Sequence, residues 1–326
     1  MKKIISILLL LLLSLAARQP MYAQDQTPAP PLEPVEQRRH LGELYESKQF
    51  YPEAVPNLTV FTFSGDIEVI HNPSIHHVQL DLYVRKGFSL WSGGVDLDDY
   101  RILMMQRNGE INASVERKRR GRFWGSDDIS FTFIIQTPSA VSTHLRTMKG
   151  DILIHDLSGT HRLQTNAGNL AISYSDGEFQ VSSTAGNVEV SNSSGQVGIQ
   201  STAGHIDLRN IHGEMRVRST AGAITGSSLT GSLLTRSIAG HVQAEFLHVE
   251  EGISIESTAG NIELTLPDDQ GFDIDARGLN LNLAGFEDFT GNLQRMSAVG
   301  SVGKGSLPVQ VHTSAGTILI QKRTGW

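Results

Sequence analysis

Cysteine is missing from this 326-residue chain. Its absence excludes disulfides, thiolate metal sites, a cysteine nucleophile and the cysteine to which a lipoprotein anchor is attached. Aromatic residues are scarce, at 6%, and hydrophobic residues reach only 39%, whereas 32 residues are glycine. This content of hydrophobic and aromatic residues is low for an α/β enzyme. It is typical of a thin β-structure that uses glycine in its turns and is held together by packing alone.

A surplus of positive charge is also missing. The formal net charge is −7, and removing Lys2, Lys3 and Arg18 with the leader described next makes it −10. Sequence-independent nucleic-acid binding needs a surplus of Lys and Arg to displace counterions. We therefore expect no nucleic-acid partner.

The N-terminus has the pattern of a signal peptide over residues 1–23. Two lysines precede an apolar run of fourteen residues, Ile4 to Ala17, and the small-residue site Met21-Tyr22-Ala23 follows. The run is shorter than the roughly 20 residues of a spanning helix, although an uncleaved anchor is the alternative. We expect export to the periplasm, the cell surface or the medium, with no transmembrane span in the mature chain. The segment 24–55 is predicted to be a proline-rich linker with a short helix over about 35–47.

Glycine recurs every nine residues over a long central stretch. It occupies eleven consecutive positions with this spacing: 150, 159, 168, 177, 186, 195, 204, 213, 222, 231 and 240. The sites two and four residues after each glycine are apolar in nineteen of 22 cases, the exceptions being His161, Gly226 and Thr235. Apolar sites two apart are typical of a strand with one buried face, and nine residues suffice for one strand and one turn.

Alternate units differ, so the true repeat is eighteen residues. Every second unit has alanine before the next glycine, at Ala167, Ala185, Ala203, Ala221 and Ala239. The pattern predicts an all-β fold, a parallel β-solenoid of the β-helix or β-roll kind with two strands and two unlike corners per coil. The predicted structural turn glycines are Gly150, Gly168, Gly186, Gly204, Gly222, Gly240, Gly260 and Gly316. A hydroxyl ladder is expected along one corner, from Thr165, Ser183, Ser201, Ser219 and Ser237.

The two ends of the repeat are irregular. Period-two strands between 56 and 140 predict an irregular first β section, with long loops at 86–100 and 116–128. Residues 141–326 are assigned to the solenoid repeats with a cap. A two-residue insertion is expected near 249–251, and the stretch 267–305 lacks the nine-residue spacing. We interpret this stretch as wider coils or a cap over the last sheet edge, which would otherwise invite self-pairing.

Neither metal nor cofactor is predicted. Calcium-binding β-rolls carry an aspartate in each glycine-rich turn, where this chain has alanine, serine or threonine. Adjacent His76 and His77 face opposite ways on a strand, and His205 and His241 are two coils apart, about 10 Å. His161 occupies an inward site, where a satisfied core histidine is the favoured explanation.

Two groups of charged residues offer functional readings. Glu189 and Asp207 are stacked neighbours on an outward column, and paired carboxylates can perform acid/base catalysis. Solvated strand residues are the favoured explanation, and we predict that the chain is not an enzyme. The second group is a basic loop that also contains an aromatic residue. One interpretation is that it contacts anionic glycan, lipopolysaccharide or membrane headgroups, and the favoured one is a solvated hairpin loop. Its residues are Arg117, Lys118, Arg119, Arg120, Arg122 and Trp124.

The recurring Ser-Thr-Ala-Gly-Asn-[Ile/Val]-Glu unit resembles the bacterial putative-adhesin domain family, a β-solenoid family of unknown function. The closing segment 313–318 and the entry strand 64–67 look like that family too, and the resemblance covers roughly 55–322. It implies an exported envelope or surface protein and carries no catalytic residues. We expect a non-enzymatic binding, adhesion or scaffold module whose partner is a cell-surface glycan or an envelope protein. The alternatives are a β-helix carbohydrate-active enzyme and an end-to-end polymerising scaffold, and the sequence leaves the oligomeric state open.

Overall fold

The fold is all-β, as predicted. The computed structural model describes residues 42–87, 97–118 and 129–323, which belong to one compact unit, Leu41–Trp326. These residues form 23 strands and a short 3-10 helix, Leu97–Asp99, and they contain no α-helix. None of them forms a helix long and apolar enough to cross a membrane. The predicted signal peptide and most of the predicted linker lie outside the described residues.

The strands fall into three groups along the chain. Seven precede the regular coils: β1 Glu43–Phe50, β2 Asn57–Thr62, β3 Ile67–His71, β4 Val78–Lys86, β5 Tyr100–Arg107, β6 Glu110–Arg117 and β7 Ile129–Thr137. Ten build the regular coils: β8 Ser142–Lys149, β9 Ile152–His155, β10 Ser158–Ala167, β11 Leu170–Ser173, β12 Asp176–Ala185, β13 Val188–Ala203, β14 Ile206–Ala221, β15 Ile224–Ala239, β16 Val242–Ala259 and β17 Ile262–Leu266. Six follow: β18 Phe272–Arg277, β19 Asn280–Ala284, β20 Thr290–Gln294, β21 Ser297–Val302, β22 Leu307–Ala315 and β23 Thr317–Lys322.

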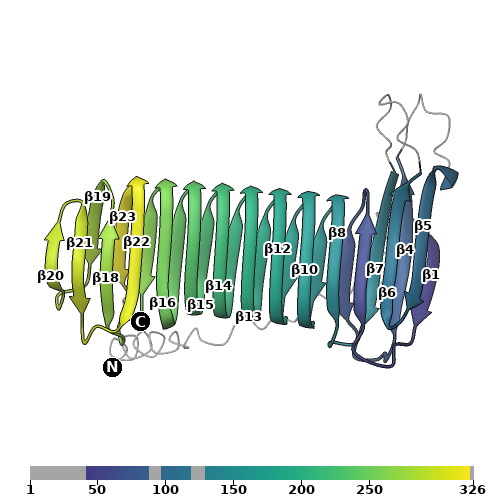
Figure 1. The fold of residues 1–326 in the computed structure, drawn as a ribbon, viewed down its shortest axis with the longest axis horizontal. Coiled ribbons are helices and arrows are strands. Elements are labelled where there is room, and N and C mark those ends of the chain that lie inside the picture. Colours follow the sequence, from purple (N-terminus) through teal and green to yellow (C-terminus); the bar gives the residue numbers. More distant parts are fainter. Residues whose placement is uncertain (1–41, 88–96, 119–128, 324–326) are drawn as a thin grey trace, which may run out of the picture. The chain divides into compact units, whose positions relative to one another are not determined.

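Successive coils pair in parallel, each strand beside its counterpart in the next coil (Figure 1). Gly159 pairs with Gly177 and Ile152 pairs with Leu170, so the partner lies eighteen residues further along the chain. Residues 159–167 and their register partners form one layer, the long sheet, and residues 152–155 and their partners form the other, the short sheet. Strands β13 to β16 run through both layers, bending at the corner between them.

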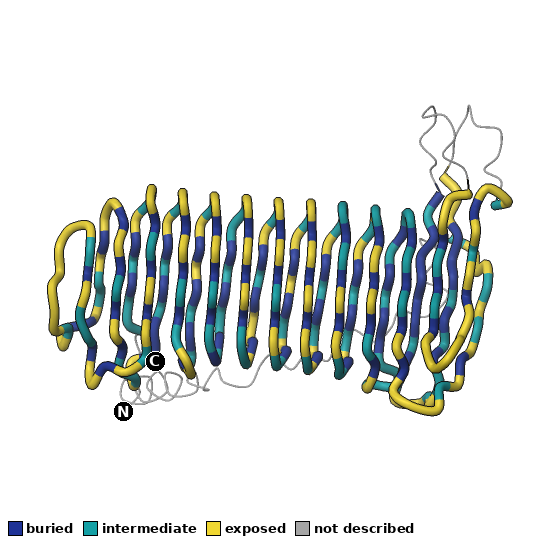
Figure 2. Tube along the Cα trace, in the orientation of Figure 1, coloured by how far each residue is buried: buried dark blue, intermediate teal, exposed yellow. Residues whose placement is uncertain are grey.

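The core lies between the two sheets and is built from alternating side chains. Buried and more exposed residues alternate along the strands of the regular coils (Figure 2), as period-two side-chain direction requires. The inward columns hold large apolar side chains such as Phe179 and Met215, both 0% exposed. Each buried aliphatic or aromatic side chain contributes very roughly 1.5–3 kcal/mol before conformational entropy is deducted.

The corners explain the glycine spacing. Gly204 has a φ of +123°, and a Cβ there would lie 2.1 Å from the carbonyl oxygen of Gly186 in the preceding coil. A side chain is therefore excluded both by backbone conformation and by the close approach of the neighbouring coil. The residue after the glycine adds a second constraint, because Asn187 Oδ1 accepts a hydrogen bond of 3.0 Å from the backbone N–H of His205. Asn169 does the same for the N–H of Asn187, at 3.0 Å.

The predicted hydroxyl column is stacked in register and faces the core. Thr165 pairs with Ser183, and Ser201 pairs with Ser219. The hydroxyl of Thr165 donates to the carbonyl oxygen of Gly150 at 3.1 Å. Among the described residues, however, the buried hydroxyls of Ser183, Ser219 and Ser237 have no hydrogen-bond partner. The column is therefore a stack of small side chains and not a hydrogen-bonded ladder.

The N-terminal section extends both sheets with strands that are out of chain order. In the long sheet β2 lies between β8 and β6, and β5 then pairs antiparallel with β6. In the short sheet β3 joins β9 to β7, after which β4 and β1 add antiparallel. The helix predicted over about 35–47 is wrong for its described part, 43–47, which belongs to β1. The free edge of β4 offers backbone partners to this segment, and Phe50 at its end is buried, so tertiary pairing overrides local helix preference.

The C-terminal section also departs from chain order. The pairing offset rises from eighteen at Gly231–Val249 to twenty at Leu233–Ile253, at the expected two-residue insertion. Beyond it, β22 pairs with β16 on one side and with β18 on the other, and β23 lies between β17 and β19. The chain thus builds its outer strands before it fills the place beside β16. Strands β21 and β20 add antiparallel at the edge of β18, which accounts for the lost spacing in 267–305.

Candidate binding face on the long sheet

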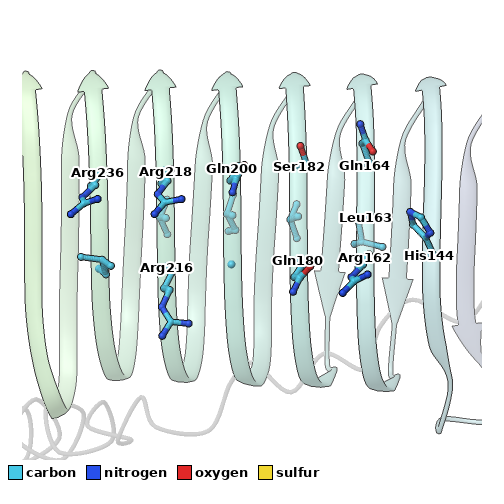
Figure 3. Close-up of a pocket in the computed structure, with 15 residues that line it drawn as sticks. His144, Arg162, Leu163, Gln164, Gln180, Ser182, Gln200, Arg216, Arg218 and Arg236 are labelled. Carbon is cyan, nitrogen blue, oxygen red and sulfur yellow. The ribbon is translucent and has the colours of Figure 1, made fainter.

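The outer surface of the long sheet carries two rows of arginine and amide side chains. They are the outward residues that alternate with the buried positions of each strand, so stacking places them side by side. Figure 3 shows them projecting from neighbouring strands. We call this surface the arginine–glutamine face; its residues are His144, Arg162, Gln164, Gln180, Ser182, Gly198, Gln200, Arg216, Arg218, Leu234 and Arg236.

The face is hollowed around Gly198. The depression has a volume of about 520 Å³, and its described lining contains four arginines, three glutamines and one histidine but no carboxylate. Gly198 leaves a gap in its row because it has no side chain. A Cβ built there would meet nothing nearer than the Phe179 carbonyl oxygen at 3.6 Å, so this glycine is not required by the fold.

The arginines differ in their partners. Arg216 forms an ion pair with Glu214, and Arg236 Nε lies 3.1 Å from Glu256 Oε2. Arg162 and Arg218 are exposed and form no ion pair or hydrogen bond with any described residue. They are three coils apart, about 14 Å at the usual strand spacing. The face therefore presents two uncompensated cations on a chain whose net charge is −7.

Sequence reasoning missed this face. The carboxylate pair considered from the sequence lies in an outward column of the short sheet, whereas these arginines lie in two outward columns of the long sheet. The signal is present in the sequence, because Arg216 and Arg218 stand twelve and fourteen residues after Gly204, and Arg162 and Arg236 occupy the same two columns in other coils.

The two carboxylates considered for catalysis lie on the short sheet and share a cation. Glu189 and Asp207 are register partners. Arg209, from the adjacent outward column, forms an ion pair with Glu189, and its Nε lies 3.5 Å from Asp207 Oδ2. Their side chains are 48% and 37% exposed, so the pair is solvated and charge-compensated.

The basic loop is described only at its start. Arg117 ends β6, and Lys118 Nζ donates a hydrogen bond of 2.8 Å to the carbonyl oxygen of Asp98. The other members, Arg119, Arg120, Arg122 and Trp124, lie outside the described residues. Contact between this loop and an anionic surface stays a prediction.

His161 is a core residue and is 0% exposed. Its Nδ1 lies 3.0 Å from the hydroxyl of Thr143, its ring stacks on Phe179 with centroids 5.4 Å apart, and its Nε2 has no partner among the described residues. Burial lowers the pKa of His161 to about 4, because the interior disfavours the charged imidazole. Within the described ranges no group of three or more histidine, aspartate or glutamate side chains could hold a metal ion.

Comparison with known proteins places the chain among domains of unknown function. Residues 145–321 match the Toastrack DUF4097 family, which is more than half of the chain. No curated protein matches it.

Three solved structures are similar to this chain at low identity. A putative adhesin from Bacteroides fragilis is 12% identical, with a TM-score of 0.40 over 85% of this chain and 96% of that one. A putative adhesin from Parabacteroides merdae is 10% identical, with a TM-score of 0.32 over 86% and 96%. A putative lipid binding protein from Parabacteroides distasonis is 10% identical, with a TM-score of 0.30 over 86% and 96%.

Proposed function

We propose, from the premise that the chain belongs to the Toastrack DUF4097 family, that it is a non-enzymatic binding module of the bacterial cell envelope. The arginine–glutamine face is its binding surface in this proposal. The stack serves as a rigid support that holds the side chains of successive coils at a fixed spacing.

The observation that carries the proposal is the contrast between the two sides of each long-sheet strand. The inward positions repeat apolar residues because they must pack, whereas the outward positions bring exposed arginines together around a depression free of carboxylates. Arg162 and Arg218 are exposed and form no ion pair or hydrogen bond with any described residue. Such groups are available to a ligand.

An enzymatic role has less support. The catalytic alternative depends on Glu189 and Asp207, and Arg209 compensates both carboxylates while solvent reaches them.

A polymerising scaffold is the second alternative. At the C-terminal end the long sheet finishes with antiparallel β21 and β20, and all five residues of β20 are exposed. End-to-end stacking of parallel coils would need a parallel edge there, so this end argues against an end-to-end polymer. Size-exclusion chromatography with light scattering tests the point, and filaments or a concentration-dependent series of oligomers would contradict it.

Export is part of the proposal and depends on the leader pattern of residues 1–23. Protease shaving of intact cells, compared with lysed cells, would tell surface display from the periplasm. Binding itself is tested by exposing the purified chain to immobilised glycans, to intact cells and to envelope proteins, beside an unrelated β-solenoid of similar net charge. Binding no stronger than that control on every surface would refute the module.

A further inference from the structure

The geometry of the arginine–glutamine face points to a ligand class, and this inference rests on the proposed function. We infer that the face binds a linear polysaccharide whose sugars carry carboxylates. The glycan chain lies along the stack, crossing successive strands, and reaches closest to the backbone at Gly198. Arg162 and Arg218 bind its carboxylates, and the glutamines between them bind its hydroxyls.

Charge is the first argument. Guanidinium groups bind carboxylates through two parallel hydrogen bonds, and this pairing gains most where the arginine has no partner of its own. Arg162 and Arg218 meet that condition among the described residues, whereas Arg216 pairs with Glu214 and Arg236 pairs with Glu256. The lining of the depression itself has no carboxylate. The carboxylates that contact it are already engaged: Glu178 with Gln180, Glu214 with Arg216 and Glu256 with Arg236.

The spacing of polar groups is the second argument. Between the coils of Arg162 and Arg218 lie two coils that present Gln180 and Gln200. Amide groups both donate and accept hydrogen bonds, as sugar hydroxyls do. Cations about 14 Å apart with amides between them suit a polymer whose charges alternate with many hydroxyls.

The described lining of the depression has no large aromatic side chain against which a sugar ring could stack, so charge must select the ligand. The lining contains no tyrosine or tryptophan, so a neutral sugar has no apolar ring face on which to stack. The gap at Gly198 instead lets a flat polar chain approach the strand backbone.

Nucleic acid and lipid fit this face less well. The coils of Arg162 and Arg236 are four strand spacings apart, about 19 Å, over which duplex DNA presents roughly eleven negative charges. The depression opposes these with four arginines, two of which are already paired. A membrane surface would favour exposed apolar residues that insert beside the cations. The lining offers only Leu234, which is partly buried.

The test measures binding of the full chain to sodium polygalacturonate by isothermal titration calorimetry at low and at physiological ionic strength. Dextran sulfate, neutral dextran, duplex DNA and anionic phospholipid vesicles are the comparison ligands. The face variant is Arg162→Gln/Arg218→Gln. Its matched control is Arg209→Gln/Arg323→Gln, which removes the same charge from the short-sheet side, where Arg323 pairs with Glu245 at 3.4 Å.

We expect polygalacturonate to bind, neutral dextran not to bind, and the face variant to lose about tenfold in affinity while the control stays within about twofold. Substitutions at Gly198 test the site independently. Gly198→Glu should lower the affinity for polygalacturonate, and Gly198→Arg should raise it. Thermal unfolding of each variant should match the parent, because these side chains point to solvent. An equal loss in the face variant and the control would overturn the site.

The comparison ligands test whether the ligand is a carboxylated glycan. Stronger binding to DNA, to vesicles or to dextran sulfate than to polygalacturonate would overturn the carboxylated glycan and leave the proposed binding module standing. The module fails separately, when the purified chain binds none of the glycans, cells or envelope proteins described above.

Discussion

His161 makes the stability of this protein depend on pH in a predictable direction. It sits between the sheets with its Nε2 unpartnered, so protonation would place a positive charge and an unpaired N–H in the core. The folded pKa of about 4 lies below the ordinary 6.5, and the unfolded chain therefore takes up a proton more readily than the folded one. The contribution of neutral His161 to the free energy of unfolding is then fully present above about pH 6.5, and it is lost as the pH drops from there toward 4.

The size of the effect follows from the shift. The difference of about 2.5 pKa units corresponds to about 3 kcal/mol when titration is complete, and at pH 5 about 2 kcal/mol of it is already lost. Urea unfolding at pH 7.5 and pH 5 measures the change. The comparison variant is Thr143→Val/His161→Leu, which removes the imidazole together with the hydroxyl that contacts it.

Between the two pH values the parent should lose about 2 kcal/mol more than the variant, since every other titrating group is shared. Met215→Leu, in the same inward column, controls for repacking and should behave as the parent does. If parent and His161 variant lose the same stability over this interval, the buried imidazole does not cause the pH dependence and the reasoning is wrong.

Three further predictions concern the coils and are checked by thermal and urea unfolding. Gly204→Ala should cost about 2 kcal/mol or more, whereas Gly198→Ala should be neutral or slightly stabilising, and equal effects would contradict the corner geometry. Asn187→Ala should cost about 1 kcal/mol through the lost acceptor at the corner, and an unchanged free energy of unfolding would contradict this role of the side chain. Ser219→Ala should be neutral or stabilise by up to about 1 kcal/mol, while Thr165→Val should destabilise by about that amount, and the reverse order would refute the assigned hydroxyl partners.

Periodicity predicted the parts of the fold that depend on neighbouring coils. The columns beginning at Ile152 and at His161 are read directly from residues eighteen apart, and the structure places them together in the core. The all-β class and the irregular ends followed from the same pattern and from where it stops.

What periodicity could not predict depends on contacts between distant segments. The strand β1 pairs with β4, whose matching residues come later in the chain by 28 (Phe50 with Val78) to 41 (Glu43 with Val84), and no local pattern distinguishes this pairing from a short helix. The neighbour of Ile253 is Val309, because a later segment occupies the place that the next coil would take. The arginine–glutamine face was missed for another reason, since outward residues need not repeat and their meaning appears only when whole columns are compared.

The position of β22 and β23 between earlier strands has a consequence for how the protein is made. A ribosome delivers the chain from its N-terminus, and the coils from β8 to β17 can stack in the order in which they emerge. The C-terminal end cannot close in that way, because its final strands belong inside, between β16 and β18. Until residue 322 arrives, two sheet edges stay unpaired and open to other chains. A chain cut short at residue 306 would therefore lack an internal coil, and the arrival of β22 and β23 is the event that completes this part of the stack.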